Sequence, residues 1–154
     1  MLHNEQKTIL GKKDASTHIV LVGGCFDLLH FGHITFLQQA KKHGDYLLIL
    51  LESDEKTRQI KGDGRPFHTQ EQRKYMLESL SCVDEVMPLP MMHTNEEYFT
   101  LIKNIEPSVI AFTEGDPQLE HKLQQTEMGG ARAVIIPKIQ TPSTTKLAKL
   151  LGLE

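Results

Sequence analysis

The chain has 154 residues and a formal net charge of −3, which gives no basic field of the kind that binds nucleic acid. Its longest apolar run, Tyr46 to Leu51, is too short to span a bilayer, and the polar stretch Met1 to Thr17 lacks the apolar core of a secretory signal. The two cysteines, Cys25 and Cys82, have no metal-ligand spacing and indicate a reducing compartment. We therefore expect a cytoplasmic protein that binds neither nucleic acid nor membrane.

Strands and helices are predicted to alternate after a polar N-terminal arm over residues 1–16. Apolar runs predict strands at about 18–23, 46–51, 84–87, 109–112 and 132–137. The segments between them predict helices at about 33–43, 54–60, 70–80, 95–105 and 118–128, and a last helix that opens within 141–145. This alternation predicts one α/β domain over residues 17–154, a doubly wound parallel sheet with helices on both faces. Ligands of such sheets bind beyond the carboxyl ends of the strands.

Local signals predict several helix ends and buried faces. Thr69 with Gln72, and Thr94 with Glu97, form the pattern of a capping box, and Gly44 is expected to end the first helix. The side chains expected to face the core from the third and last helices are Tyr75, Met76, Leu77, Leu80, Leu147, Leu150 and Leu151.

The stretch from Gly23 to His33 has the residues best suited to chemistry. Gly23 and Gly24 follow the first predicted strand and are expected to let the backbone turn tightly. His30 and His33 then lie three residues apart at the start of a helix, where unpaired N–H groups and the helix dipole favour phosphate. A single histidine at such a place is more often a cap, but two of them suit charge that develops on a phosphorus centre.

Three other features suit phosphate or acceptor binding, each beside a simpler structural interpretation. Ser143-Thr144-Thr145 offers hydroxyls at a helix start, a pattern that alone favours a cap. The glycine-rich loop 61–66 carries Lys61 and precedes Arg73, which can clamp a phosphate with two hydrogen bonds, although a solvated loop fits equally well. Asp27 suits an acceptor hydroxyl, a water-mediated contact to magnesium, or a turn cap.

The motif His30-Phe31-Gly32-His33 and the residues before it resemble the signature of the cytidylyltransferase-like nucleotidyltransferases, and the resemblance extends over about residues 18–150. It implies a Rossmann-like nucleotidyltransferase fold and direct transfer of a nucleotidyl group, with Mg2+ and with release of pyrophosphate. The residues that it implies are His30, His33 and Lys61 for catalysis; Gly24, Cys25, Phe26, Gly32, His33, Ser143, Thr144 and Thr145 for the nucleotide; and Asp27, Lys61 and Arg73 for the acceptor. No side chain is expected to ligate the metal directly.

The loop Lys61-Gly62-Asp63-Gly64-Arg65-Pro66, followed by Glu71-Gln72-Arg73, is similar to that of bacterial heptose-1-phosphate adenylyltransferases. We therefore expect AMP transfer to a sugar 1-phosphate such as heptose 1-phosphate. A glycerol-3-phosphate or phosphoalcohol cytidylyltransferase and a flavin-nucleotide adenylyltransferase remain alternatives. A non-catalytic nucleotide-binding module is another, because the lead into Ser143 lacks the arginine that is usual there. Members of the family are commonly dimers, so a homodimer is one expectation.

Overall fold

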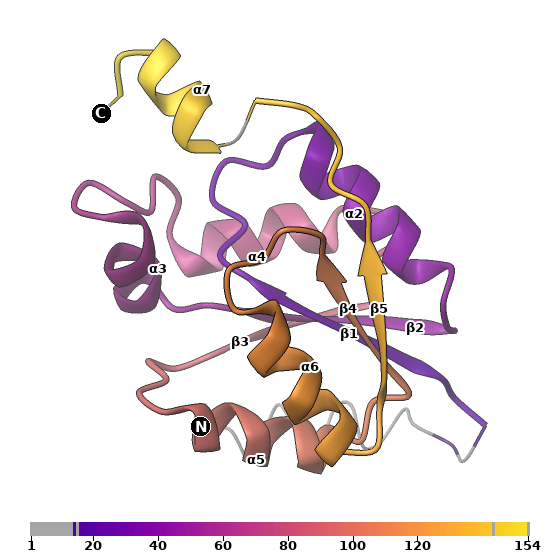
Figure 1. Ribbon diagram of the computed structural model, residues 1–154. Helices are drawn as coiled ribbons and strands as arrows, with labels where there is room; N and C mark the ends of the chain where they lie inside the picture. The colour runs from indigo at the N-terminus through magenta and orange to yellow at the C-terminus, as the bar shows by residue number, and fades with distance from the viewer. Residues whose placement is uncertain (1–13, 15, 143, 154) are drawn as a thin grey trace.

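The computed structural model describes residue 14, residues 16–142 and residues 144–153, so nearly all of the expected arm over 1–16 lies outside the described residues. In the described part, the strands form one parallel sheet in the order β3-β2-β1-β4-β5. They are β1 (Ile19–Gly24), β2 (Tyr46–Leu51), β3 (Glu85–Pro88), β4 (Val109–Thr113) and β5 (Arg132–Ile136). The expected doubly wound sheet is confirmed, and the strand order reverses between β1 and β4 (Figure 1).

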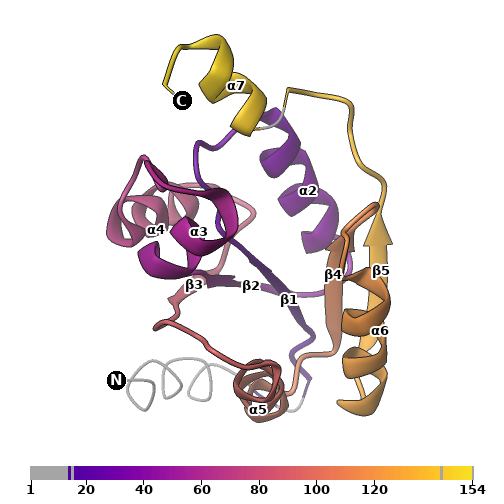
Figure 2. The ribbon, with the colours of Figure 1, turned by 60° about the vertical axis from the view of Figure 1, so that its left-hand side comes forward.

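Helices cover both faces of the sheet. They are α2 (Phe31–Lys41), α3 (Asp54–Lys61), α4 (Gln70–Glu78), α5 (Asn95–Ile105), α6 (Leu119–Met128) and α7 (Thr144–Leu150). Figure 2 shows α2 and α5 on opposite sides of the sheet. Both predicted capping boxes are present, at the starts of α4 and α5. None of these described helices is both long and apolar enough to cross a membrane.

Alternate residues of the central strands supply two separate apolar clusters. Val20 and Val22 of β1 pack on the face covered by α2 and α4, whereas Ile19 and Leu21 pack on the face covered by α5. All four are buried, as are Leu47, Leu48 and Ile49 of β2 beside Val20, Leu21 and Val22. This burial on both faces is why the strands appear in the sequence as continuous apolar runs rather than as alternating ones. The removal of these side chains from water stabilises the sheet and fixes its register.

Two predictions about the helices of this face are wrong. Helix α2 ends at Lys41, ahead of Gly44. A Cβ on Gly44 would lie 2.5 Å from the carbonyl oxygen of His18, so this glycine permits a close approach of two backbones. Tyr75 was expected in the core with Met76 and Leu77 but is 76% exposed. Consecutive helical residues are about 100° apart, so three of them do not share one face, and Leu77 is the one that is buried.

Helix α7 also differs from its prediction. Leu150 and Leu151 are 71% and 68% exposed, whereas Ala148 is fully buried and Leu147 is half-buried. The helix lies beyond the carboxyl end of the sheet (Figure 1), so the side of α7 that is turned away from the sheet is exposed to solvent. The contact of α7 with the rest of the molecule is therefore made by the side that carries Ala148.

Candidate active site

The turn after β1 is built differently from its prediction. Gly23 and Gly24 are the extended last residues of the strand, so the expectation of a glycine turn is wrong. The left-handed residues are Phe26 and Leu28, with φ of 48° and 54°. A side chain makes that conformation unfavourable, so other contacts must hold it. Phe26 supplies one of them, since its ring is buried in the core cluster under α2 and α4.

His30 and His33 form a stacked pair at the start of α2. His30 is the N-cap, and its Nδ1 accepts a hydrogen bond of 3.1 Å from the N–H of Gly32. The two imidazole centroids are 3.9 Å apart with 29° between the planes, and the ring of Phe26 lies 5.4 Å from that of His33. Because Nδ1 of His30 accepts, the neutral ring carries its proton on Nε2 and can donate there. The structural role of a cap and a donor role are thus combined in one side chain.

Both imidazoles are neutral near pH 7. Burial lowers the pKa of His33 to about 4, and the nearby charges of His30 and Lys61 act in the same direction against that of Asp27. Burial and the charge of Lys61 also lower the pKa of His30. Nδ1 of His33 is buried and has no hydrogen-bond partner among the described residues. Buried polar atoms normally have a partner, so this unsatisfied nitrogen is an exception among the buried groups of the site.

The lead into α7 lies against this histidine pair. A Cβ on Gly32 would lie 2.8 Å from Cγ2 of Thr141, so the glycine lets the two segments meet. Figure 2 shows the start of α7 beside the N-terminal end of α2. Ser143 and the side chain of Thr144 lie outside the described residues, whereas Thr145 is half-buried. The structure thus brings the histidine motif and the last helix together at the carboxyl edge of the sheet.

Lys61 lies close to the histidine pair, and Cys25 lies close to Lys61. Lys61 is the exposed last residue of α3, and its charge lowers the pKa of both histidines. Cys25 is half-buried after Gly24, and burial raises the pKa of its thiol. The thiol therefore stays protonated near pH 7, which makes it a poor nucleophile. Lys61 is the cation of this group that solvent and ligand can reach.

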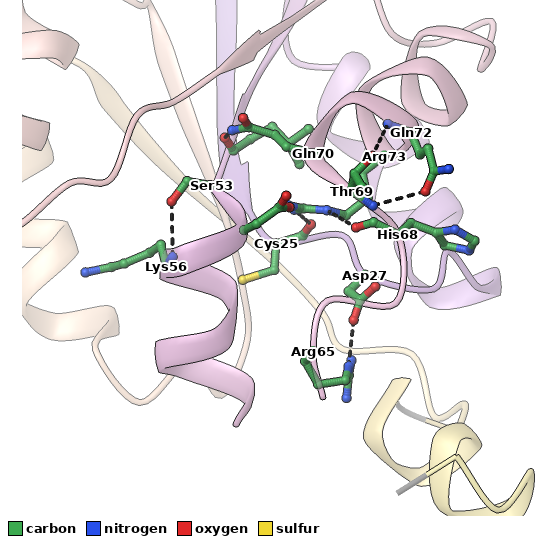
Figure 3. A network of polar contacts seen from close by, with 12 residues as sticks. Cys25, Asp27, Ser53, Lys56, Arg65, His68, Thr69, Gln70, Gln72 and Arg73 are labelled. Carbon is green, nitrogen blue, oxygen red and sulfur yellow. Dashed lines mark hydrogen bonds and ion pairs between the residues drawn. The ribbon is translucent and has the colours of Figure 1, made fainter. Parts of the chain in front are cut away.

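Asp27 is buried in an ion pair. Its carboxylate accepts hydrogen bonds from Nε of Arg65 at 2.6 Å and from the N–H of Phe67 at 3.1 Å, and its residue is 2% exposed. The guanidinium of Arg65 lies 4.7 Å from the centroid of the Phe67 ring. Figure 3 shows Asp27 directed at Arg65. The expected acceptor contact of Asp27 is therefore corrected, because this side chain holds the loop after α3 against the motif turn.

Arg73 is also placed differently from its prediction. It is fully buried and donates to the carbonyl oxygens of Cys25 at 2.6 Å and His68 at 3.1 Å, and to the carboxylate of Asp54 at 2.8 Å. Figure 3 shows it between Cys25 and His68. Since these bonds occupy Nε, Nη1 and Nη2, Arg73 positions the site rather than contacting an acceptor. Of the residues expected at the acceptor, Lys61 alone is accessible.

Two residues of this edge were missed by sequence reasoning. Arg65 belongs to the loop 61–66, which is predicted to bind phosphate, but no local pattern marks it as the partner of Asp27. Glu52 directly follows the buried strand β2, and its carboxylate accepts a hydrogen bond from the hydroxyl of Tyr98. An acidic residue immediately after a buried strand was the available signal for it.

Comparison with known proteins places most of the chain in one family. The cytidylyltransferase-like family model matches residues 21–144. A relative from Geobacter sulfurreducens, named bifunctional protein HldE, is 33% identical over 141 residues, and one of the same name from Aliarcobacter butzleri is 40% identical over 109 residues. The alignments cover 90% and 71% of this chain but 28% and 20% of the relatives, so the chain spans less than a third of either.

Solved structures show the same fold. A lipopolysaccharide core biosynthesis protein from Thermoplasma volcanium superposes with a TM-score of 0.64 at 21% identity, over 81% of this chain and 98% of that one. A pantoate-beta-alanine ligase from Francisella tularensis, solved with beta-gamma ATP and beta-alanine, gives a TM-score of 0.65 at 16% identity, over 90% of this chain and 66% of that one. At these identities the likeness concerns the fold alone.

Proposed function

Because this chain belongs to the cytidylyltransferase-like family, we propose that it is a nucleotidyltransferase that moves AMP from ATP to a sugar 1-phosphate such as heptose 1-phosphate. The observation that carries the proposal is the meeting of the stacked pair His30 and His33 with the lead into α7 at Gly32. Two segments from opposite ends of the sequence thereby surround one site at the edge where a doubly wound sheet binds its ligands.

The proposed reaction is an in-line displacement. An oxygen of the acceptor phosphate attacks the α-phosphorus of ATP, the bond from that phosphorus to the bridging oxygen breaks, and pyrophosphate leaves with the electron pair. The protein positions the two substrates and stabilises the charge on the phosphoryl oxygens. Nε2–H of His30 and N–H groups at the start of α2 donate to these oxygens, and the ammonium group of Lys61 neutralises negative charge. No covalent intermediate with the protein is needed.

Magnesium belongs to the proposal as part of the substrate, bound to the triphosphate. Within residues 14, 16–142 and 144–153, no three His, Cys, Asp or Glu side chains are grouped so that they could hold a metal ion. The carboxylate of Asp27 is turned to Arg65 and Phe67. Magnesium commonly keeps its waters and takes phosphate oxygens as ligands, so the residues present fit a metal that arrives with ATP.

The choice of ATP and of a sugar phosphate depends on the resemblance of the loop 61–66 and of Glu71-Gln72-Arg73. The curated relatives named bifunctional protein HldE support this branch of the family. The absence of an arginine in the lead into α7 supports the alternative of a module that binds nucleotide without turnover. Lys138 is exposed in that lead and supplies a positive charge.

A matrix of substrates tests the proposal. Pyrophosphate release is measured with ATP or CTP against heptose 1-phosphate or glycerol 3-phosphate, and ATP with heptose 1-phosphate is expected to be the productive pair. His33→Ala should lower kcat by about 100-fold or more while ATP still raises the melting temperature. His43→Ala is the matched control, because His43 is an exposed histidine outside the site. Binding of ATP without pyrophosphate release from any pair would favour the non-catalytic module.

A further inference from the structure

Glu52 occupies the carboxyl edge of the sheet beside the histidine motif. It follows β2 directly, and its N–H donates to the carbonyl oxygen of Gly24 at 3.0 Å. The preceding residue, Leu51, packs in the cluster under α2 and α4. Successive side chains of a strand point to opposite faces, so Glu52 is directed to the α5 side. There the hydroxyl of Tyr98 on α5 donates to its two carboxylate oxygens at 2.8 and 3.0 Å.

The carboxylate of Glu52 has more hydrogen-bonding capacity than the protein uses. Two carboxylate oxygens can accept about four hydrogen bonds, whereas the tyrosine hydroxyl supplies one proton. The described residues give the Glu52 side chain no other hydrogen bond. Burial raises the pKa of Glu52, against the lowering effects of Tyr98, Lys56, Lys122 and Arg73. A half-buried, under-satisfied carboxyl group at a ligand-binding edge is the kind of group that a substrate completes.

The surroundings of Glu52 select the chemistry of that substrate group. Lys56 comes from α3 and donates to the carbonyl oxygen of Met92, and Lys122 comes from α6 and pairs with Asp116 at 2.6 Å. These elements belong to the two halves of the sheet, so Glu52 faces the place where the strand order reverses. A phosphate would be repelled by the carboxylate. A hydroxyl, which donates a proton, is the complementary partner.

We infer that Glu52, oriented by Tyr98, is a specificity-determining residue that binds a hydroxyl of a polyhydroxy acceptor. The inference rests on the proposed transfer to a sugar phosphate and adds the residue that distinguishes a sugar from other phosphorylated acceptors. The triphosphate lies with His30 and His33 on the α2 side, while the acceptor's hydroxyls lie toward α5. Glu52 therefore affects the affinity for the acceptor and not that for ATP.

The test replaces Glu52 and Tyr98 together, so that neither side chain is left without its hydrogen-bond partner. The double variant Glu52→Met with Tyr98→Phe replaces both polar groups by apolar ones of similar size, an exchange that can be nearly neutral for stability. Glu52→Gln is a second, more conservative variant. Glu55→Gln, an exposed residue of the first turn of α3, is the matched control. Calorimetry measures the Kd of heptose 1-phosphate and of inorganic phosphate, and steady-state rates give the two KM values.

The double variant is expected to raise the Kd and KM for heptose 1-phosphate by about tenfold or more, as the loss of a charge-assisted hydrogen bond requires. Its KM for ATP, its Kd for inorganic phosphate and its melting temperature stay near those of the wild type. Glu52→Gln should also raise the Kd and KM for heptose 1-phosphate. An unchanged Kd for heptose 1-phosphate in both variants overturns the inference, even if the wild type turns over. A Glu52-dependent Kd in a wild type that releases no pyrophosphate keeps the inference and rejects the transfer. A wild type that neither binds nor turns over the sugar phosphate rejects both.

Discussion

Loss of either partner of the buried pair Asp27 and Arg65 should strongly destabilise the fold. Nε of Arg65 lies 2.6 Å from Oδ2 of Asp27, and both residues are 2% exposed. Removal of one partner leaves a buried charge without its counter-charge, which costs about 3–5 kcal/mol. Domains of this size are typically stable by about 5–15 kcal/mol, so the loss is a large share of the total. We therefore expect Asp27→Asn and Arg65→Met each to lower the free energy of unfolding by that amount.

Urea denaturation followed by far-UV circular dichroism measures these free energies, since the chain contains no tryptophan. The double variant Asp27→Asn with Arg65→Met should lose less than the sum of the single losses, with a coupling energy of about 1–3 kcal/mol. The reasoning is refuted if Asp27→Asn costs less than about 1 kcal/mol, the lower end for a lost buried hydrogen bond. A higher KM for the acceptor with an unchanged fold would then restore Asp27 to the acceptor site.

Two further expectations concern His33 and Gly32. The pKa of His33 is lowered from 6.5 to about 4, so the unfolded chain binds more protons between these values and stability falls as the pH is lowered through them. This shift makes the free energy of unfolding about 3 kcal/mol lower at acidic pH than at neutral pH. The difference between the urea midpoints at the two pH values should therefore be smaller in His33→Gln than in the wild type, and an equal difference in the two proteins would contradict the prediction. Gly32→Ala places a methyl group 2.8 Å from Cγ2 of Thr141 and 2.9 Å from Cε1 of His30. This variant should lower kcat by about tenfold or more, because the methyl group displaces His30. Gly129→Ala is the control, since a Cβ at residue 129 would lie no closer than 3.5 Å to another atom. Equal values of kcat in the two variants would count against the packing of Gly32 on Thr141 and His30.

The local features of the fold were predictable from the sequence. Continuous apolar runs such as Tyr46 to Leu51 identify strands buried on both faces, and the pairs Thr69 with Gln72 and Thr94 with Glu97 identify helix starts. These signals are contained in a few neighbouring residues. The alternation of strands and helices then leaves few possible sheet topologies, because the connections between parallel strands are right-handed.

The positions of charged side chains within the site were not predictable in the same way. Asp27 and Arg65 are 38 residues apart, and Arg73 reaches Cys25 across 48 residues. Whether such a side chain meets a substrate or a buried partner depends on packing that no local pattern records. The left-handed backbone conformations of Phe26 and Leu28 were not predictable either. Glycine usually occupies this conformation, and here the tertiary contacts of the turn outweigh that local preference. Glu52 was visible as an acid after a strand, but its link to Tyr98 spans 46 residues.

The guanidinium of Arg73 has a dynamic consequence. Its three acceptors, on Cys25, Asp54 and His68, belong to the motif turn, to α3 and to the loop before α4. If one of these segments opened alone, the buried cation would lose a partner while the others still held it in place, which makes separate opening costly. The three segments therefore form one cooperative opening unit, and their backbone amides should exchange hydrogen with solvent at a common free energy. The motif turn, the start of α3 and the loop before α4 would thus loosen together rather than one at a time.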